Sequence, residues 1–301
     1  MIAVWGANGF IGHHLTSFLK QREIEAKLFA RNFDQFPYQS CPLFQIYEFD
    51  FSHPKNYMDR LMDCRLAVLM VTASYVRNFE GSPEAEIAMN VDPYKNFIDA
   101  IPVDSNIERI IYLSSGGAIY GNVDKREPIS EEYHVNPIST YGKSKFEIEE
   151  YIKTKSSSAK WDYTILRLSN PIGVDRKSRG LVNAVLKACK EETPVTVYGD
   201  GSIVRDYFDV REIGRCIMSS GSHEVARNKI YNVGSGAAST IMEVIETAQK
   251  LSGKTLQIEY KDNNPADVKY NVLNCKKISH DLNWHATRNL EETMREMWKN
   301  M

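Results

Sequence analysis

The sequence lacks the signals of a disulfide framework, a nucleic-acid-binding surface and a membrane-spanning segment. Its five cysteines are widely spaced with no C-x-x-C pair, so we expect ordinary buried thiols and neither a disulfide framework nor a metal site. Lys and Arg number 37 against 39 Asp and Glu, with no basic block, so nothing indicates nucleic-acid binding. No apolar run reaches the ~18 residues of a membrane span, and the first predicted strand starts at residue 2, which leaves no room for a signal peptide. We therefore expect a cytoplasmic protein with no membrane contact.

What is present is a regular alternation of strands and helices. The chain has 301 residues, 43% of them hydrophobic, and near this length a single core tends to divide in two. The alternation through the first half predicts right-handed crossovers and a parallel sheet covered on both faces. Strands are predicted over 2–5, 26–30, 66–71, 109–114 and 163–168, and helices from the first strand to residue 20, near 57–62 and over 84–101.

We therefore predict an α/β fold, a Rossmann-type doubly wound parallel sheet with a smaller mixed α/β substrate-binding domain. From about residue 171 the strict alternation fails, and short strands mix with helices. We assign residues 1–170 to the sheet domain, with 205–233 returning to it, and residues 171–204 and 234–301 to the smaller domain. Ligands of such sheets lie at the C-terminal ends of the strands, so the loops there should converge on one crevice.

Three glycines directly follow the first apolar run, in the segment W-G-A-N-G-F-I-G-H-H-L-T at residues 5–16. A strand that breaks into glycines and restarts as a helix presents backbone N–H groups and a helix N-terminus to a pyrophosphate. Gly6 allows the tight turn, Gly9 lets the phosphate approach the backbone, and Gly12 lets the helix pack closely on the strand. The spacing predicts a dinucleotide site, and a plain glycine-rich turn is the alternative.

A second motif is Y-G-K-S-K at residues 141–145, at the start of an amphipathic run. A spacing of four on a helix puts Tyr141 and Lys145 on the same face, so the ammonium can lie beside the phenol. A neighbouring cation favours the phenolate, which brings the pKa of Tyr141 down from ~10 toward working pH. The pair therefore predicts a proton donor and acceptor.

At these residues the chain resembles the short-chain dehydrogenase/reductase superfamily, in its extended branch of nucleotide-sugar epimerases, dehydratases and reductases. The resemblance runs in consistent order from residue 1 to about residue 296. The motifs that carry it are G-A-N-G-F-I-G (6–12), L-S-S-G-G-A-I-Y-G (113–121), Y-G-K-S-K (141–145), R-L-S-N-P (167–171), Y-G-D-G-S-I-V-R-D-Y (198–207) and Y-N-V-G-S-G (231–236).

The resemblance implies a nicotinamide dinucleotide as cofactor. A site that prefers NAD places Asp or Glu about 20 residues beyond the glycines to bind the ribose, whereas an arginine suits a 2′-phosphate. Ala30 and Arg31 occupy that stretch, so NADP(H) is favoured and NAD(H) is the alternative; Arg31 could also stack on the adenine or lie in solvent. The implied cofactor-binding residues are Gly6, Asn8, Gly9, Phe10, Ile11, Gly12, Arg31, Asp50, Phe51, Thr72, Ala73, Asn90, Tyr141 and Lys145.

The resemblance also implies the catalytic roles. Tyr141 is the proton-transfer residue, and Lys145 is its electrostatic partner and binds the nicotinamide ribose; in a reduction, Tyr141 protonates the alkoxide that hydride transfer forms. A hydroxyl near that oxygen would stabilise the developing charge, but this chain has Gly116 where the family carries Ser or Thr. We assign that role to Ser115 first and Ser114 second; either serine could instead cap the end of its own strand.

The implied substrate is a nucleotide-diphosphate sugar. Arg205 and Asn170 are the foremost candidates, since guanidinium matches phosphate oxygens bidentately and Asn170 matches a family residue that binds phosphate. The family has an arginine just ahead of Asp267, and this chain does not, so Arg176 or Arg179 could supply the missing charge. The implied substrate-binding residues, each of which alone could be ordinary packing or surface, are Asn170, Arg176, Thr196, Tyr198, Arg205, Tyr207, Ile241 and Asp267.

Three functional hypotheses remain. Arg31 favours an NADPH-dependent reductase of a nucleotide-linked 4-keto-6-deoxyhexose, and the alternative is an NAD-dependent 4-epimerase that oxidises the 4-hydroxyl and returns the hydride to the opposite face. A dehydratase is disfavoured, because Gly117 and Ala118 stand where family dehydratases carry Asp and Glu. The third hypothesis is an NADP(H)-binding sensor or scaffold without turnover, against which the retention of Tyr141 and Lys145 argues.

A homodimer is also predicted. The helices over 84–101 and 141–153 resemble the pair that family dimers pack into a four-helix bundle. Apolar residues such as Ile87, Val91 and Tyr94 could instead face the sheet of their own monomer.

Overall fold

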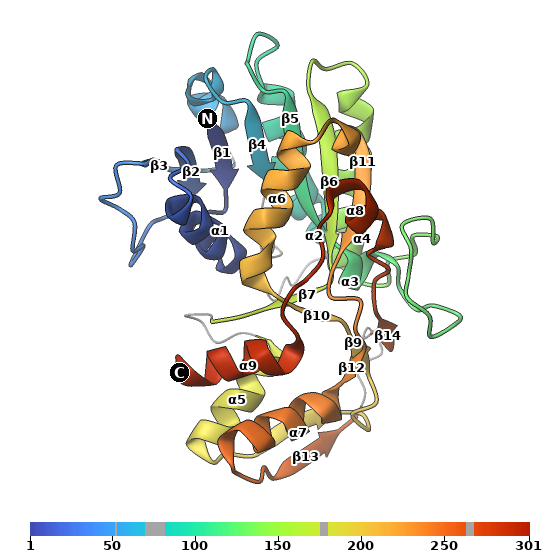
Figure 1. Ribbon diagram of the computed structural model, residues 1–301. Helices are drawn as coiled ribbons and strands as arrows, with labels where there is room; N and C mark the ends of the chain where they lie inside the picture. The colour runs from blue at the N-terminus through green and yellow to red at the C-terminus, as the bar shows by residue number, and fades with distance from the viewer. Residues whose placement is uncertain (52, 70–81, 175–179, 263–267) are drawn as a thin grey trace.

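The computed structural model describes residues 1–51, 53–69, 82–174, 180–262 and 268–301. A parallel sheet lies at its centre, with the described strands in the order β11-β6-β5-β4-β1-β2-β3 (Figure 1). These strands are β1 (Ile2–Trp5), β2 (Ala26–Ala30), β3 (Phe44–Glu48), β4 (Leu66–Leu69), β5 (Arg109–Ser115), β6 (Asp162–Leu168) and β11 (Lys229–Val233).

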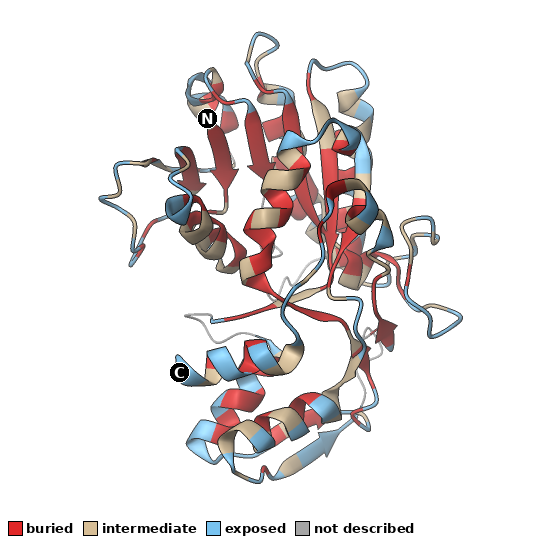
Figure 2. Ribbon diagram, in the orientation of Figure 1, coloured by how far each residue is buried: buried red, intermediate tan, exposed pale blue. Residues whose placement is uncertain are grey.

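Both faces of this sheet are covered by helices. Successive residues of each strand point to opposite sides, and because both sets are apolar, each face needs a covering layer. In β1, Ile2 and Val4 pack with α1 (Phe10–Gln21), α6 (Ile213–Ser222) and α8 (Lys276–Leu282). Ala3 and Trp5 pack on the other side with α2 (Pro83–Ala100) and α4 (Thr140–Ser156). The inner strands are accordingly largely buried (Figure 2), whereas only Phe44 of the edge strand β3 is buried. This arrangement confirms the predicted Rossmann-type doubly wound sheet.

The strand order reverses between β1 and β4. The chain runs from β1 outward to β2 and β3, then crosses to β4 on the other side of β1 and continues to β5 and β6. In such sheets the ligand crevice lies beyond the carboxyl ends of the strands at this switch point. The glycine turn after β1 and the serines at the end of β5 both lie at that edge.

A second, smaller core lies below the sheet in Figure 1. It is formed by α5 (Leu181–Glu191), α7 (Ile241–Ser252) and α9 (Leu290–Lys299) with β8 (Val195–Tyr198) and β13 (Ile258–Lys261). Short strands run between the two cores: β7 (Asn170–Ile172) pairs with β10 (Tyr207–Asp209), and β9 (Val204–Arg205) lies between β12 (Ser239–Thr240) and β14 (Tyr270–Asn271). The remaining short helices are α3 (Gly116–Ile119), η1 (Pro54–Leu61), η2 (Val210–Glu212) and η3 (Glu224–Ala226).

Several details differ from the sequence prediction. Strand β3 was not predicted, and the helix expected near 57–62 is the 3₁₀ helix η1. Strand β4 ends at Leu69, and the rest of the strand predicted over 66–71 lies outside the described residues. The predicted division into domains stays a prediction; within the segment 234–301, α8 packs against the large sheet rather than with the smaller core.

The cysteines are free, but they are not uniformly buried as expected. Cys64, Cys189 and Cys216 are buried, whereas Cys41 and Cys275 are half-buried. No group of potential metal ligands is found among the residues that the structure describes. Within the same part of the chain, no helix has the length and apolar character needed to cross a bilayer.

Candidate active site

The turn between β1 and α1 depends on its glycines. Gly6 has a φ of +88°, in the left-handed region that glycine adopts without strain, and its N–H donates to Phe29 O at 2.8 Å. A Cβ on Gly12 would lie 2.1 Å from Gly6 O and 2.7 Å from the Cα of Ala7, so only glycine lets the helix approach the turn this closely. Gly9 is the N-cap of α1 and supplies no side-chain capping group, so an anion can bind the first amides of the helix.

The other predicted cofactor residues surround this turn or lie on α2. Asn8 Nδ2 donates to Asn32 O at 3.1 Å, which ties the turn to the exposed end of β2, directly after Arg31. Asp50 is exposed after β3, and the half-buried ring of Phe51 packs on Tyr94 at 5.0 Å between centroids. The remaining members are Phe10 and Ile11, which begin α1, Asn90, which is buried on α2, and Thr72 and Ala73, which lie outside the described residues.

Tyr141 and Lys145 lie one turn apart near the start of α4, which Ser139 caps by accepting a hydrogen bond from Gly142 N at 3.1 Å. Lys145 is only 5% exposed, and its Nζ donates to Leu113 O at 2.9 Å. The same Nζ lies 4.9 Å from the ring centroid of Tyr112 and 5.9 Å from that of Tyr141. The structure thus brings the two motif residues together at the carboxyl end of β5.

The ionisation of this pair differs from the sequence prediction. Burial raises the pKa of Tyr141, against the opposing effect of a hydrogen bond with the Ser115 side chain. Burial also lowers the pKa of Lys145 to about 7, against the opposing field of Glu149. The prediction that the lysine draws the phenol pKa down is wrong here, because the buried ammonium is directed to Leu113 O and the Tyr112 ring.

Gly116 stands where the family carries Ser or Thr, and the packing around it explains the absence of a side chain. A Cβ there would lie 2.7 Å from Leu273 Cδ1 and 3.1 Å from Arg167 O, both in the interior. Of the two alternative serines, Ser115 contacts Tyr141. Ser114 is buried, and its Oγ makes no hydrogen bond with any residue that the structure describes, so it does not cap its strand.

Three polar side chains converge over Gly117. A Cβ at this glycine would lie 3.7 Å from Ser115 Oγ, 3.9 Å from Asn170 Oδ1 and 3.9 Å from Asn271 Oδ1. Asn271 is 1% exposed and donates from Nδ2 to Gly116 O at 2.8 Å, whereas its Oδ1 accepts no hydrogen bond from the described residues. A buried, unpaired acceptor costs free energy, so this oxygen is available to a donor that enters over Gly117.

Asn271 is a site residue that the sequence prediction missed. It lies on the two-residue strand β14, whose register pairs Asn271 with Arg205 on β9. A strand this short has no hydrophobic periodicity, and 154 residues separate Asn271 from Gly117 in the chain, so no local pattern could have indicated it.

The predicted substrate residues occupy two regions. Asn170 pairs in register with Tyr207, and both its N and Nδ2 donate to Asp206 O at 3.0 and 3.1 Å. Arg205 Nη1 donates to Val268 O at 2.5 Å, beside Asn271. Thr196 and Tyr198 lie instead on β8 in a separate sheet, Ile241 begins α7, and Arg176 and Asp267 fall outside the described residues.

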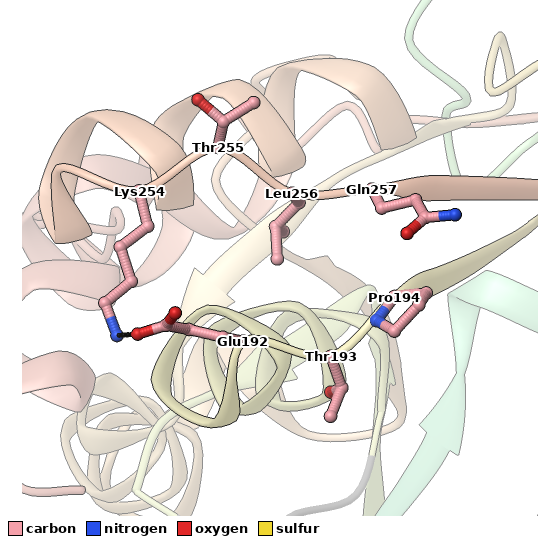
Figure 3. Close-up of a pocket in the computed structure, with 7 residues that line it drawn as sticks. All are labelled: Glu192, Thr193, Pro194, Lys254, Thr255, Leu256 and Gln257. Atoms are coloured by element: carbon pink, nitrogen blue, oxygen red, sulfur yellow. Dashed lines mark hydrogen bonds and ion pairs between the residues drawn. The ribbon is translucent and has the colours of Figure 1, made fainter.

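A cavity of about 340 Å³ opens elsewhere, between the end of α5 and the segment that follows α7 (Figure 3). An ion pair of 2.8 Å between Lys254 and Glu192 lies at one side of it. The cavity carries none of the predicted catalytic or cofactor residues. Its lining residues are Glu192, Thr193, Pro194, Lys254, Thr255, Leu256 and Gln257.

The fold and this site define a dinucleotide-binding protein of the Rossmann type with a tyrosine–lysine pair at the switch edge of its sheet. The family model "NAD dependent epimerase/dehydratase family" matches residues 2–234. The chain belongs to this family and is an enzyme.

The chain is also similar to known enzymes that act on nucleotide-linked sugars. A dTDP-4-dehydro-6-deoxyglucose reductase of Escherichia coli is 25% identical over 100% of this chain and 97% of its own length. A UDP-glucose 4-epimerase of Bacillus subtilis is 26% identical over 64% of this chain and 62% of its own. The structure of a Thermus thermophilus UDP-glucose 4-epimerase in complex with NAD has a TM-score of 0.87 at 23% identity, covering 99% of this chain and 97% of that one.

Proposed function

We propose that the protein is an oxidoreductase acting at C4 of a nucleotide-diphosphate sugar, and specifically an NADPH-dependent reductase of a nucleotide-linked 4-keto-6-deoxyhexose. The observation that carries the proposal is the position of Tyr141 beside Ser115, which converges with Asn170 and Asn271 over Gly117. That arrangement combines a proton donor with acceptors for the hydroxyl groups of a sugar. Similarity over the whole chain to a reductase and to a putative UDP-glucose 4-epimerase supports the assignment to C4 chemistry, and Arg31 favours the reductase.

The residues of this chain would divide the reaction as follows. A nicotinamide cofactor held at the glycine turn would supply the hydride for the carbonyl carbon. Tyr141 donates its phenolic proton to the oxygen that becomes an alkoxide, and the raised pKa of Tyr141 keeps that proton in place until the oxygen becomes basic. Ser115 hydrogen-bonds the phenol and would lie next to the same oxygen. The protonated form of Lys145, whose Nζ lies 5.9 Å from the centroid of the Tyr141 ring, would add positive charge there.

The substrate would extend from this point along the short strands. Asn170 and Asn271 would hold the sugar, and Arg205, on the strand beside Asn271, would pair with the diphosphate. Tyr207, Thr196, Tyr198 and Ile241 follow toward the smaller core and would surround the nucleoside, with Arg176 and Asp267 assigned there by resemblance alone.

The cofactor would be NADP(H) rather than NAD(H). Arg31 is exposed directly after β2, next to the residue that Asn8 binds, and no carboxylate occupies that position. An arginine there suits a 2′-phosphate. The proteins that bind NAD among the similar structures favour the second candidate, a 4-epimerase that retains NAD.

Incubation of the purified protein with a panel of dTDP, UDP and GDP sugars, followed by absorbance of the reduced cofactor, tests the proposal. Oxidation of dissociable NADPH on addition of a keto sugar is expected for the reductase. NAD that copurifies with the protein and interconversion of 4-epimers without net cofactor change would indicate the epimerase. Cofactor binding with no turnover of any sugar would leave the sensor hypothesis.

We also propose a homodimer through α2 and α4. These helices pack on each other within the monomer, where Lys95 and Glu147 form an ion pair of 2.7 Å. Val91 and Tyr94 face the sheet of their own monomer, so the interface would use the outer surface of the pair, where Met89 is exposed. Light scattering should give twice the chain mass of 34.4 kDa.

A further inference from the structure

Three ionisable residues form one stripe along α4. Tyr141, Lys145 and Glu149 follow one another at intervals of four, so they lie on the same face of the helix. Lys145 and Glu149 are both buried, whereas the next residue, Glu150, is exposed and pairs with Lys153 at 2.7 Å. The buried acid therefore belongs to the catalytic face of the helix and the exposed one to the surface.

Glu149 is held by a buried arginine from the sheet. Arg167 Nη2 lies 2.7 Å from Glu149 Oε2, and Arg167 Nε lies 3.2 Å from both carboxylate oxygens. A carboxylate without exposure is stable as an anion only when such a partner is present. The pair thus fixes a negative charge one helical turn beyond Lys145.

Further buried hydrogen bonds fix the position of Arg167. Arg167 Nη1 donates to the Tyr120 hydroxyl at 3.1 Å, and that hydroxyl donates to Asn232 Oδ1 at 2.7 Å. Asn232 in turn donates from its backbone N–H to Glu131 Oε1 at 2.8 Å. A chain of buried hydrogen bonds therefore runs from α4 through β6 to β11, and it leaves the Glu149 carboxylate little freedom to turn away.

The described groups that face Lys145 come from four elements. Tyr141 and Glu149 lie on α4, Tyr112 comes from β5, Tyr94 packs behind Tyr112 from α2, and Arg167 reaches Glu149 from β6. Burial keeps the phenols of Tyr94 and Tyr112 protonated, because it raises the pKa of both. Of the charged groups in this set, Glu149 is the one whose field favours the ammonium form of Lys145, in opposition to burial.

We propose that Glu149 is a positioning residue: its carboxylate, fixed by Arg167, keeps Lys145 protonated beside Tyr141 and so sets the alkaline limit of cofactor binding and turnover. The part of this inference that concerns turnover rests on the proposed function, whereas the part that concerns cofactor binding does not. Removing the negative charge disfavours the ammonium, so the pH at which Lys145 loses its proton moves down.

The test is the pH dependence of cofactor affinity and of kcat/KM between about pH 5 and 10. Glu149→Gln should move the alkaline fall of both quantities to lower pH by about one unit, the scale of a single nearby charge. Glu150→Gln removes the same charge from the exposed side of the same helix and should leave the profile unchanged. Lys145→Met should abolish the alkaline fall, which assigns it to this lysine, and Glu149→Asp, which keeps the charge, should restore the wild-type position.

Loss of one partner of a buried ion pair can also unfold a protein. The double variant Glu149→Gln with Arg167→Gln leaves no unpaired charge, and its profile should move in the same direction. An alkaline fall that stays in place in both variants, even with reduced affinity or melting temperature, would overturn the proposal. Cofactor affinity needs no sugar, so the absence of turnover with every nucleotide sugar would refute the proposed function and leave this test readable.

Discussion

At the scale of single residues, the assignment of Tyr141 depends on its hydroxyl. Tyr141→Phe removes the proton donor without changing the ring that packs above Lys145. We expect kcat to fall by about 10²–10⁴, the usual contribution of a general acid, with cofactor affinity retained. Single-turnover assays and fluorescence titration with the cofactor measure the two quantities.

Tyr151→Phe is the matched control for this variant. Tyr151 lies on the same helix, and its hydroxyl bonds the Asp99 carboxylate at 2.6 Å on the surface. Its loss should leave kcat unchanged. Wild-type turnover by the Tyr141 variant would remove the acid–base assignment, and equal losses in both variants would point to a general effect on α4.

Alanine substitutions at the adjacent glycines 116 and 117 should differ in their effect on stability. Gly116→Ala forces a methyl group to 2.7 Å from Leu273 Cδ1 in the interior, so we expect a loss of about 1–3 kcal/mol in the free energy of unfolding. Gly117→Ala places its methyl group at 3.7–3.9 Å from its neighbours, which is ordinary contact, so stability should stay within about 0.5 kcal/mol.

The effect on substrate binding should be the reverse, with the larger change in Gly117→Ala. The Gly117 methyl group occupies the space over which Ser115, Asn170 and Asn271 converge, so KM for the sugar should rise while the protein remains folded. Urea denaturation and steady-state kinetics on both variants give the comparison. A Gly117→Ala enzyme with unchanged KM would mean that the sugar does not bind over this glycine.

At the scale of elements, the turn before α1 depends on glycine at particular positions of the sequence. Gly12→Ala would bring a Cβ to 2.1 Å from Gly6 O, and since the obstructing atoms are backbone, α1 must move away from β1. Gly9→Ala meets the same oxygen at 3.1 Å, a smaller conflict. Cofactor affinity by titration calorimetry should therefore fall in both variants, and further for Gly12→Ala. Equal affinities would contradict the close packing described here.

The long elements were predictable because each carries a local signal. Strand β1 is a short apolar run that a glycine ends, and α4 has its cap at Ser139 and its apolar positions at helical spacing. Strand β3 carries no such signal: it lies at the sheet edge, and only Phe44 of its residues is buried. The strands between the two cores have two or three residues each and form only because distant segments meet there. The same reason explains why Asn271 and the partner of Glu149 could not be derived from local pattern.

At the scale of the whole molecule, the site lies between the two cores, and one buried carboxylate ties together several of the segments that form it. Asp206, which is fully buried, accepts hydrogen bonds from Ser235 N at 2.8 Å, Gly236 N at 3.1 Å and Leu273 N at 3.3 Å. Its backbone oxygen holds Asn170. Asp206 therefore helps to fix the segments that bring Asn170 and Asn271 over Gly117, together with the hydrogen bond from Asn271 Nδ2 to Gly116 O.

The buried lysine makes the stability of the whole protein depend on pH. Burial lowers the pKa of Lys145 from 10.5 to about 7, so between these values the folded protein holds the amine largely neutral while the unfolded chain holds it protonated. The unfolded state then binds more protons, and the free energy of unfolding rises with pH across this window. Other groups titrate there as well, so the quantity to measure is the difference between wild type and Lys145→Met.

Urea denaturation at several pH values from 7 to 10 should show wild type gaining stability relative to Lys145→Met as the pH rises. The gain should level off above pH 10.5, where the amine is neutral in both states. A difference that stays constant would mean that the buried amine keeps its proton throughout this range. The charge of Glu149 would then outweigh burial, and the alkaline limit of the enzyme would have to come from another group.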